Sequence, residues 1–128
     1  MITLGADTQA QVAEALKTKL NAGGTFVIYS GTPPANAQAA LSGNTVLATH
    51  TLSTFTRSGA VVTAGAISNV TPSANGTASF FRCIVSGVAE IQGSVTVSGG
   101  GGDAIVNNTT YSTAGTSQVI SMAFTAPA

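Results

Sequence analysis

The sequence predicts a mainly β fold, an antiparallel β-sandwich or jelly-roll-like structure with one short N-terminal α-helix. After residue 24 the chain is a series of short runs, either apolar or alternately apolar and polar, which Gly, Asn and Pro turns separate. Only residues 7–22 show the apolar repeat of an amphipathic helix. Strands and helices do not alternate along the chain, which argues against a parallel α/β sheet.

A chain of 128 residues is long enough for one domain with one core and too short for two. We therefore expect a single domain over residues 1–128, with the helix at 7–22 and the β-sandwich at 25–128. Within the sandwich, residues 31–44 contain Pro33 and Pro34, which cannot continue a strand ladder and favour an extended chain. This loop is long for a compact domain, so we expect it to reach a neighbouring subunit.

The composition is poor in charge and rich in small residues. Charged residues make up 6% of the chain, and four Lys and Arg balance four Asp and Glu. A protein with near-zero net charge tends to associate, so we expect copies of itself or a partner to cover much of its surface. A nucleic-acid partner is not expected, because phosphate contacts need clustered Lys and Arg.

Residues 7–22 carry the signals of the helix. Thr8 and Gln11 have the spacing of a capping box, in which each side chain bonds to a free backbone N–H of the first turn. Val12, Leu16 and Leu20 then recur every four residues and form a narrow apolar stripe. A narrow stripe predicts a helix that lies across the edge or the end of the β core.

Six to eight short strands are expected after the helix. They cover residues 25–30, 45–53, 60–70, 77–86, 89–97, 104–106 and 119–125. The alternation in the second strand places Val46, Ala48, His50 and Leu52 on one face, and the last strand turns Ile120, Met122 and Phe124 inward. In residues 77–86 one face carries Phe81, Cys83 and Val85, and the opposite face carries Phe80, Arg82 and Ile84.

No catalytic, cofactor or metal site is expected. His50 lies on an apolar strand face without a nucleophile motif, so we interpret it as a core or interface histidine rather than a general base. Cys83 shares its face with apolar residues, which is typical of a buried thiol. The Gly-rich run at 99–102 is followed by Asp103 and by no Lys-Ser or Lys-Thr, so we interpret it as a hairpin loop and not as a phosphate loop.

The candidate functional residues are interface residues. Arg57, Arg82 and Glu90 stand out because charge is rare in this chain, and Pro33 and Pro34 mark the long loop. Arg82 and Glu90 lie on adjacent strands of one expected hairpin and could pair across it. We hypothesise that these residues set the register between subunits or bind an acidic partner surface. The alternative is ordinary solvent-facing charge.

Five runs of the sequence form a recognisable series in this order: Gly-Thr-Phe-Val-Ile-Tyr-Ser-Gly-Thr-Pro-Pro at 24–34, Val-Leu-Ala-Thr at 46–49, Asn-Gly-Thr-Ala-Ser-Phe-Phe-Arg at 75–82, Gln-Gly-Ser-Val at 92–95 and Asn-Asn-Thr-Thr at 107–110. Together they resemble a family of small proteins of tailed bacteriophages and prophages, which belong to the virion structural module. The resemblance extends from about Gly24 to Phe124. These motifs are turn and strand segments, and no functional residue can be carried over from the family.

The resemblance implies a part of the phage particle. The leading hypothesis is a capsid decoration, or cement, protein that binds the outer head surface as a homotrimer and joins neighbouring major capsid proteins. The alternative is a tail, connector or fibre-associated structural protein. A third reading is a carbohydrate-binding or adhesion module, although the chain has no Trp and two Tyr to present to a sugar.

We expect the protein to be made in the cytoplasm of the host bacterium and to reside on the capsid surface of the virion. No run reaches the roughly 18 apolar residues of a membrane span, and the N-terminus lacks the basic and apolar regions of a signal peptide. A membrane partner is therefore not expected.

Overall fold

One helix and nine strands make up the fold, in a computed structural model that describes residues 2–127. The helix α1 spans Ala6–Asn21. The strands are β1 (Thr25–Ser30), β2 (Val46–Thr51), β3 (Phe55–Ser58), β4 (Val61–Ala64), β5 (Gly76–Val85), β6 (Val88–Thr96), β7 (Ala104–Val106), β8 (Thr110–Tyr111) and β9 (Val119–Thr125). The predicted mainly β class with one N-terminal helix is confirmed.

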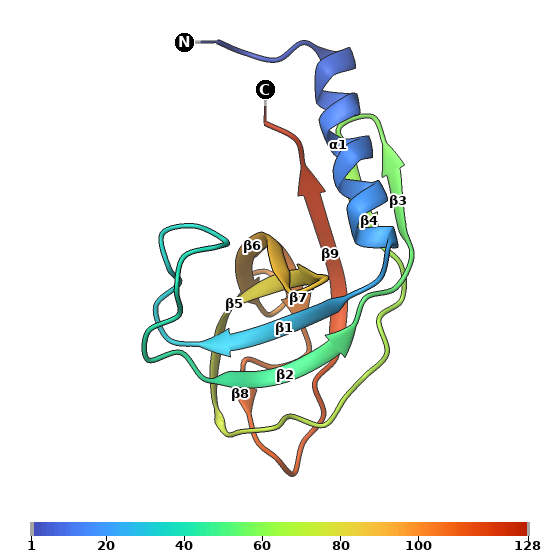
Figure 1. The fold of residues 1–128 in the computed structure, drawn as a ribbon. Helices are drawn as coiled ribbons and strands as arrows, with labels where there is room; N and C mark the ends of the chain where they lie inside the picture. Colours follow the sequence, from blue (N-terminus) through green and yellow to red (C-terminus); the bar gives the residue numbers. More distant parts are fainter. Residues whose placement is uncertain (1, 128) are drawn as a thin grey trace.

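The strands form one curled sheet in the order β2-β1-β5-β6-β7-β9-β4-β3, and β8 pairs separately with β5 (Figure 1). Every neighbouring pair is antiparallel, as predicted, except β6 and β7, which are parallel. The Gly-rich run at 99–102 lies in the connection between these two strands, and because they are parallel its interpretation as a hairpin loop is wrong. Because the sheet curls, its two halves face each other and enclose one main core.

Aromatic and aliphatic side chains from β1, β2, β5 and β9 fill this core. The rings of Phe26 and Phe81 stack with their centroids 4.5 Å apart, and both are almost fully buried. On the other face of β1 and β5, a second cluster contains Val27, Tyr29 and Phe80. The prediction that residues 25–30 are apolar on both faces is thus explained, because β1 is covered on both sides.

The helix begins earlier than predicted. Its N-cap is Gly5, which makes no side-chain cap bond, so the expected capping box of Thr8 and Gln11 is wrong. Thr8 lies inside the first turn of the helix, so it is not the N-cap residue that a capping box requires. Val12 is 39% exposed, and the buried stripe consists of Ala13 and Leu20 with Leu16 beside them. The helix packs against β3 and β4, at one end of the sheet as expected (Figure 1).

Three β-bulges explain where the predicted faces and pairs fail. The ladders skip Leu47 on β2, Glu90 on β6 and Ile120 on β9. A bulge inserts one residue and reverses the inward and outward alternation on one side of it. Consequently Leu47 is buried, whereas Val46 and Ile120, both predicted to face inward, are 39% and 56% exposed.

The region between β2 and β5 also differs from the prediction. The expected strand at 60–70 is reduced to Val61–Ala64, and β3 (Phe55–Ser58) was missed. β3 contains a single apolar residue, Phe55, so it has no recognisable alternation. Ile67 is buried outside any strand, and Val70 makes an isolated bridge to Ser117. The short β8 was also missed.

Both ends of the sheet are blunted by other parts of the chain. At β3, the Asn21 side chain donates to Phe55 O (3.2 Å) and accepts from Phe55 N (2.7 Å). At β2, the Ser73 N–H donates to Leu47 O (2.8 Å) and the Ser73 hydroxyl donates to Val46 O (3.2 Å). Covering edge strands in this way prevents unspecific strand pairing.

Candidate functional site

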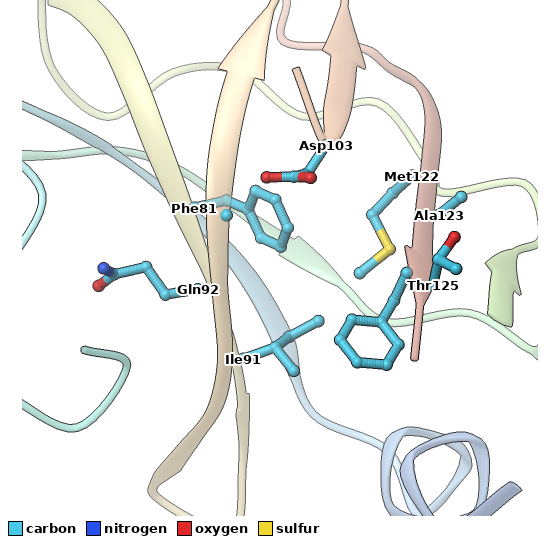
Figure 2. A pocket seen from close by; sticks show the side chains of 9 residues that line it. Phe81, Ile91, Gln92, Asp103, Met122, Ala123 and Thr125 are labelled. Carbon is cyan, nitrogen blue, oxygen red and sulfur yellow. The ribbon is translucent and has the colours of Figure 1, made fainter. Parts of the chain in front are cut away.

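A slot opens inside the sheet between β6 and β9, where β7 is too short to separate them along their whole length. β7 pairs with β6 at Val95 and Thr96, and with β9 between Val119 and Met122. Beyond the first residue of β7, Ala104, the two strands diverge around a cavity of about 480 Å³ (Figure 2). We define the slot by the nine residues that line it: Phe81, Ile91, Gln92, Gly93, Asp103, Met122, Ala123, Phe124 and Thr125.

The β6 wall of the slot presents backbone hydrogen-bonding groups. The Ser94 N–H donates to Asp103 Oδ2 (3.0 Å), so it faces β7 and not β5. Backbone groups two residues apart on a strand face the same side, so the N–H and C=O of Gln92 also face that side. Among residues 2–127 no strand pairs with Gln92 there, because the β6–β7 ladder begins at Val95.

The β9 wall presents a matching set. The Ala123 N–H donates to Asp103 O (3.4 Å), so it faces the slot. The Ala126 N–H instead donates to Ala60 O at 2.8 Å, on the β4 side. Thr125 lies between them in this alternation and shares the direction of Ala123, so its N–H and C=O also face the slot. Two backbone edges therefore oppose each other across the cavity.

The floor of the slot is apolar and belongs to the core. Figure 2 shows Ile91 and Met122 directed into the cavity from opposite strands, while the Gln92 side chain points away from it. The Phe81 ring reaches the floor because β6 has a glycine at position 93. A Cβ there would lie 2.6 Å from Cε1 of the ring. Gly93 thus admits the ring that forms the floor.

Asp103 closes the end of the slot nearest β7. Its Oδ2 accepts from the N–H and from the hydroxyl of Ser94, at 3.0 and 3.1 Å, and its own N–H is 3.1 Å from the same hydroxyl oxygen. Since the carboxylate is bonded to β6 and the Asp103 carbonyl to β9, this residue spans both walls. The slot consequently has one fixed end and one open end.

Arg82 serves the long loop. Its side chain is 6% exposed and donates to Gln92 Oε1 (3.0 Å), Asn36 O (3.3 Å) and Ala39 O (2.8 Å). Gln92 in turn donates to Pro34 O (2.9 Å). The loop at 31–44 is therefore bonded to the outer face of β5 and β6 in its own chain. Figure 1 shows it as the lobe between β1 and β2.

The predicted pair between Arg82 and Glu90 is wrong. Arg82 lies opposite Gln92 in the register, and Glu90 is the extra residue of a bulge. Glu90 instead forms an ion pair with Lys19 of α1 (3.2 Å). The bulge is the physical reason, because it turns Glu90 away from the face that carries Arg82.

The remaining charges gather around the helix. Glu14 pairs with Lys17 and with Arg57 of β3, both at 2.9 Å. Hydrogen bonds from Lys17 and then from Arg57 lower the pKa of the Glu14 carboxyl. Two of the interface candidates, Arg57 and Glu90, are thus bonded to α1. Arg82 is bonded to the loop at 31–44, and the Pro34 carbonyl in that loop accepts from Gln92, while Pro33 is exposed. The structure does not bring these five residues into one cluster, and their interface role stays a prediction.

His50 belongs to a buried polar network. Its Nδ1 is 2.9 Å from Ser68 O and its Nε2 is 2.8 Å from the Ser117 hydroxyl, which is 2.9 Å from the Tyr111 hydroxyl. A carbonyl only accepts, so Nδ1 carries the proton and Ser117 donates to Nε2, while Tyr111 donates to Ser117. Burial lowers the pKa of His50, which keeps the ring neutral. The predicted core histidine with a hydrogen-bond partner is confirmed.

The histidine and serine are both fully buried, and neither lines the slot. The arrangement therefore links β2 to the 65–70 segment and the 111–117 loop. Cys83 is also fully buried, as predicted, and burial raises the pKa of its thiol to about 12. Within residues 2–127 no three His, Cys, Asp or Glu side chains gather in a way that could hold a metal ion.

Comparisons with protein-family models, with curated proteins and with solved structures found no match to this chain. Across residues 2–127, no helix has the length and the apolar composition that a membrane crossing requires.

Sequence reasoning missed the slot. Its walls are backbone groups, and its existence depends on where β7 starts relative to β6 and β9. The alternation of residues 89–97 indicates a strand but not the partner on each side. Gly93 is the one local signal, because a glycine within a strand often marks a close approach of other groups.

Proposed function

We propose that this chain is a non-enzymatic structural protein of a tailed-phage particle. In this role it is a capsid decoration (cement) protein that binds the outer head surface as a homotrimer and stabilises contacts between major capsid proteins. The proposal begins from the sequence runs that resemble the phage virion family. The structural observation that supports it is the distribution of charge over the surface.

Most of the charged side chains lie on α1 or beside it. Residues 20–56, 58–81 and 104–128 contain no Asp, Glu, Lys or Arg. Six of the eight charged residues lie on α1 or pair with it, one is the buried Arg82, and one is Asp103 beside the slot. We call the exposed residues of the three uncharged stretches the charge-free surface.

A charge-free surface is suited to burial against protein. Removing it from water requires no desolvation of ions, and the Thr, Ser and Asn side chains on it can exchange water for partner groups. Leu41, Val46 and Ile120 add exposed apolar area, at 40%, 39% and 56% exposure. A protein that must bind a shell at many equivalent positions needs such a surface more than it needs a catalytic cleft.

The mechanism follows from linkage. A protein that binds the assembled shell and not its dissociated subunits stabilises the shell by a free energy that grows with its affinity and concentration. Every bound copy adds interfaces that must break before the shell can rupture. No chemical step is required.

The test is the location and copy number of the protein in the source phage. Purified heads and tails are separated, and the protein is quantified in each by mass spectrometry against labelled standards. Hundreds of copies with DNA-filled heads support the decoration role. A few copies that travel with tails overturn it in favour of the connector or fibre role, and absence from both overturns a virion role altogether.

A pair of variants tests whether the charge-free surface binds the shell. Thr49→Glu places a carboxylate on the exposed side of β2, whereas Ala15→Glu places the same charge on the exposed side of α1, among existing charges. Both are added to heads that lack the protein. We expect Thr49→Glu to reduce binding and Ala15→Glu to bind like the unchanged chain. Equal binding by all three would contradict the assignment of this surface.

A further inference from the structure

We propose that the slot between β6 and β9 binds residues 2–5 of a second copy of this chain as an added β-strand. The proposal goes beyond the virion role, because it concerns self-association and can be tested on the purified protein alone. It would account for the homotrimer by a defined contact.

The slot has the place in the sheet and the backbone chemistry of a missing strand. It continues the line of β7 and lies between β6 and β9, the two strands with which β7 pairs. Gln92 on β6 and Thr125 on β9 direct backbone groups into it from opposite sides, as derived above from the bonds of Asp103. A strand of three to four residues spans about 10–13 Å at roughly 3.3 Å per residue. Such a segment would supply the partners of both edges.

Residues 2–5 are the segment of this chain that fits. They lie outside any helix or strand and lead out of the start of α1 (Figure 1), and Gly5 is the N-cap whose carbonyl accepts from the Gln9 N–H. Ile2 is 91% exposed, the highest exposure among the large apolar side chains described. The order Ile2, Thr3, Leu4 alternates apolar and polar residues with the period of a strand. Inserted in the slot, Ile2 and Leu4 would face the apolar floor and Thr3 the solvent.

The two outer edges of the sheet are each covered in part by the chain itself. Asn21 bonds to Phe55 of β3, and Ser73 bonds to Val46 and Leu47 of β2, as described above. Strand addition provides affinity through backbone bonds and specificity through the side chains that enter the floor. Ile91, Met122 and Phe124 supply that floor, and a β-branched side chain such as Ile2 packs well on it.

The contact joins two different surfaces: residues 2–5 of one copy, which we call the arm, and the slot of the next copy. Such a heterologous contact closes into a ring when the rotation between copies permits, and otherwise continues as a filament. A ring of three copies is the closed form that the expected homotrimer requires. In each copy both the arm and the slot would then be occupied.

Disulfide trapping tests the occupant directly. Thr3→Cys is mixed with Thr125→Cys, whose side chain lies on the exposed side of the β9 wall, and Ala123→Cys is tested in parallel to cover the neighbouring register. The control partner is Thr56→Cys, an exposed threonine on the edge strand β3. The native Cys83 is buried with a pKa of about 12 and does not interfere.

We expect mixed disulfides between Thr3→Cys and a β9 variant to form at least about tenfold faster than with the β3 variant, because cross-strand neighbours meet the geometry of a disulfide. Equal rates with β3 and β9 would overturn the slot assignment. Closure within single molecules of the double variant Thr3→Cys/Thr125→Cys, without cross-linking in the mixture, would overturn the second copy as the occupant.

Association in solution provides an independent measurement with a matched control. Ile2→Asp places a charge on the floor side of the arm and Thr3→Asp places it on the solvent side, and both positions are exposed, so both variants fold. In sedimentation velocity we expect Ile2→Asp to raise the dissociation constant about tenfold to a hundredfold, and Thr3→Asp to leave it within about threefold. A monomeric unchanged chain, or equal effects of both variants, would overturn the proposal.

Discussion

Replacing Arg82 by Met should release the long loop at 31–44 and destabilise the protein by about 1.5–3 kcal/mol. Arg82 is 6% exposed and donates three hydrogen bonds, of which two reach carbonyls of the loop. A hydrogen bond from a charged group contributes roughly 1.5–3 kcal/mol. The sum of three is an overestimate, because the guanidinium loses hydration when buried and the loop carbonyls regain water in the variant. We therefore expect Arg82→Met to lower the free energy of unfolding by about the contribution of one such hydrogen bond.

The measurement combines urea unfolding with hydrogen exchange. In Arg82→Met the amides of Gln38 and Ala39, whose bonds lie inside the loop, should exchange faster. The amide of Ser42, which donates to the Asn44 side chain, should be less affected. Met retains most of the apolar stem of Arg, so the core beneath the loop stays filled.

Gln92→Met is the matched variant. It removes one acceptor of Arg82 and the donor to Pro34 O, but leaves both bonds from Arg82 to the loop. Its effect should be smaller than that of Arg82→Met, and the double variant should cost less than the sum, because the two side chains share a bond. A loss below about 0.5 kcal/mol in Arg82→Met with unchanged exchange in the loop would refute the anchoring role.

Three further outcomes are expected. Burial holds the pKa of His50 below its unfolded value of about 6.5, so the unfolded chain binds more protons than the folded chain as the pH falls below 6.5. The free energy of unfolding should therefore decrease on acidification by up to about 1.4 kcal/mol per pH unit. A flat profile from pH 7 to 5 in urea unfolding would contradict this. Cys83 should remain unmodified by a thiol reagent at pH 8 until urea unfolds the protein, and rapid labelling of the folded chain would disprove its burial. Gly93→Ala should lower the free energy of unfolding by about 1–3 kcal/mol, because its Cβ would collide with the Phe81 ring. In the control Gly115→Ala the nearest atom lies 3.4 Å from the new Cβ, so stability should change by less than about 0.5 kcal/mol. Equal effects of the two variants would refute the close approach.

The charge pattern connects the fold with the proposed role. Ion pairs of Glu14 and Glu90 connect α1 to β3 and to the β5–β6 hairpin, so most of the charged residues gather around the helix. Exposed pairs of this kind contribute little each to stability. Among residues 2–127, Asp103 is the one exposed charged residue that neither lies on α1 nor pairs with it, and the surface around the remaining strands is suited to burial against protein.

The sequence by itself determined the class of the fold and most of its elements. β1 matches residues 25–30, and the faces of β5 are as predicted, with Phe81 and Cys83 in the main core and Phe80 on the opposite side. The interpretations of His50 and Cys83 as buried residues were also correct. These are local properties, because alternation in one strand depends only on which side chains avoid water.

Only the tertiary structure decided which strands pair and where their alternation breaks. The bulges at Leu47, Glu90 and Ile120 are features of the pairing between strands, and no run of residues reveals them. Each one moved a side chain that the alternation had placed on another face, including the charge expected to pair with Arg82. The bonds of Arg82 to the loop at 31–44 likewise join segments more than 40 residues apart.

The slot is the clearest case of this division. Composition indicated a protein that associates, and alternation indicated the strands that line the slot. The open backbone edges arise because β7 is three residues long and pairs with only part of β6 and of β9. Strand order and register are properties of contacts between distant segments, and the free energy of the whole sheet fixes them rather than the preferences of any one segment.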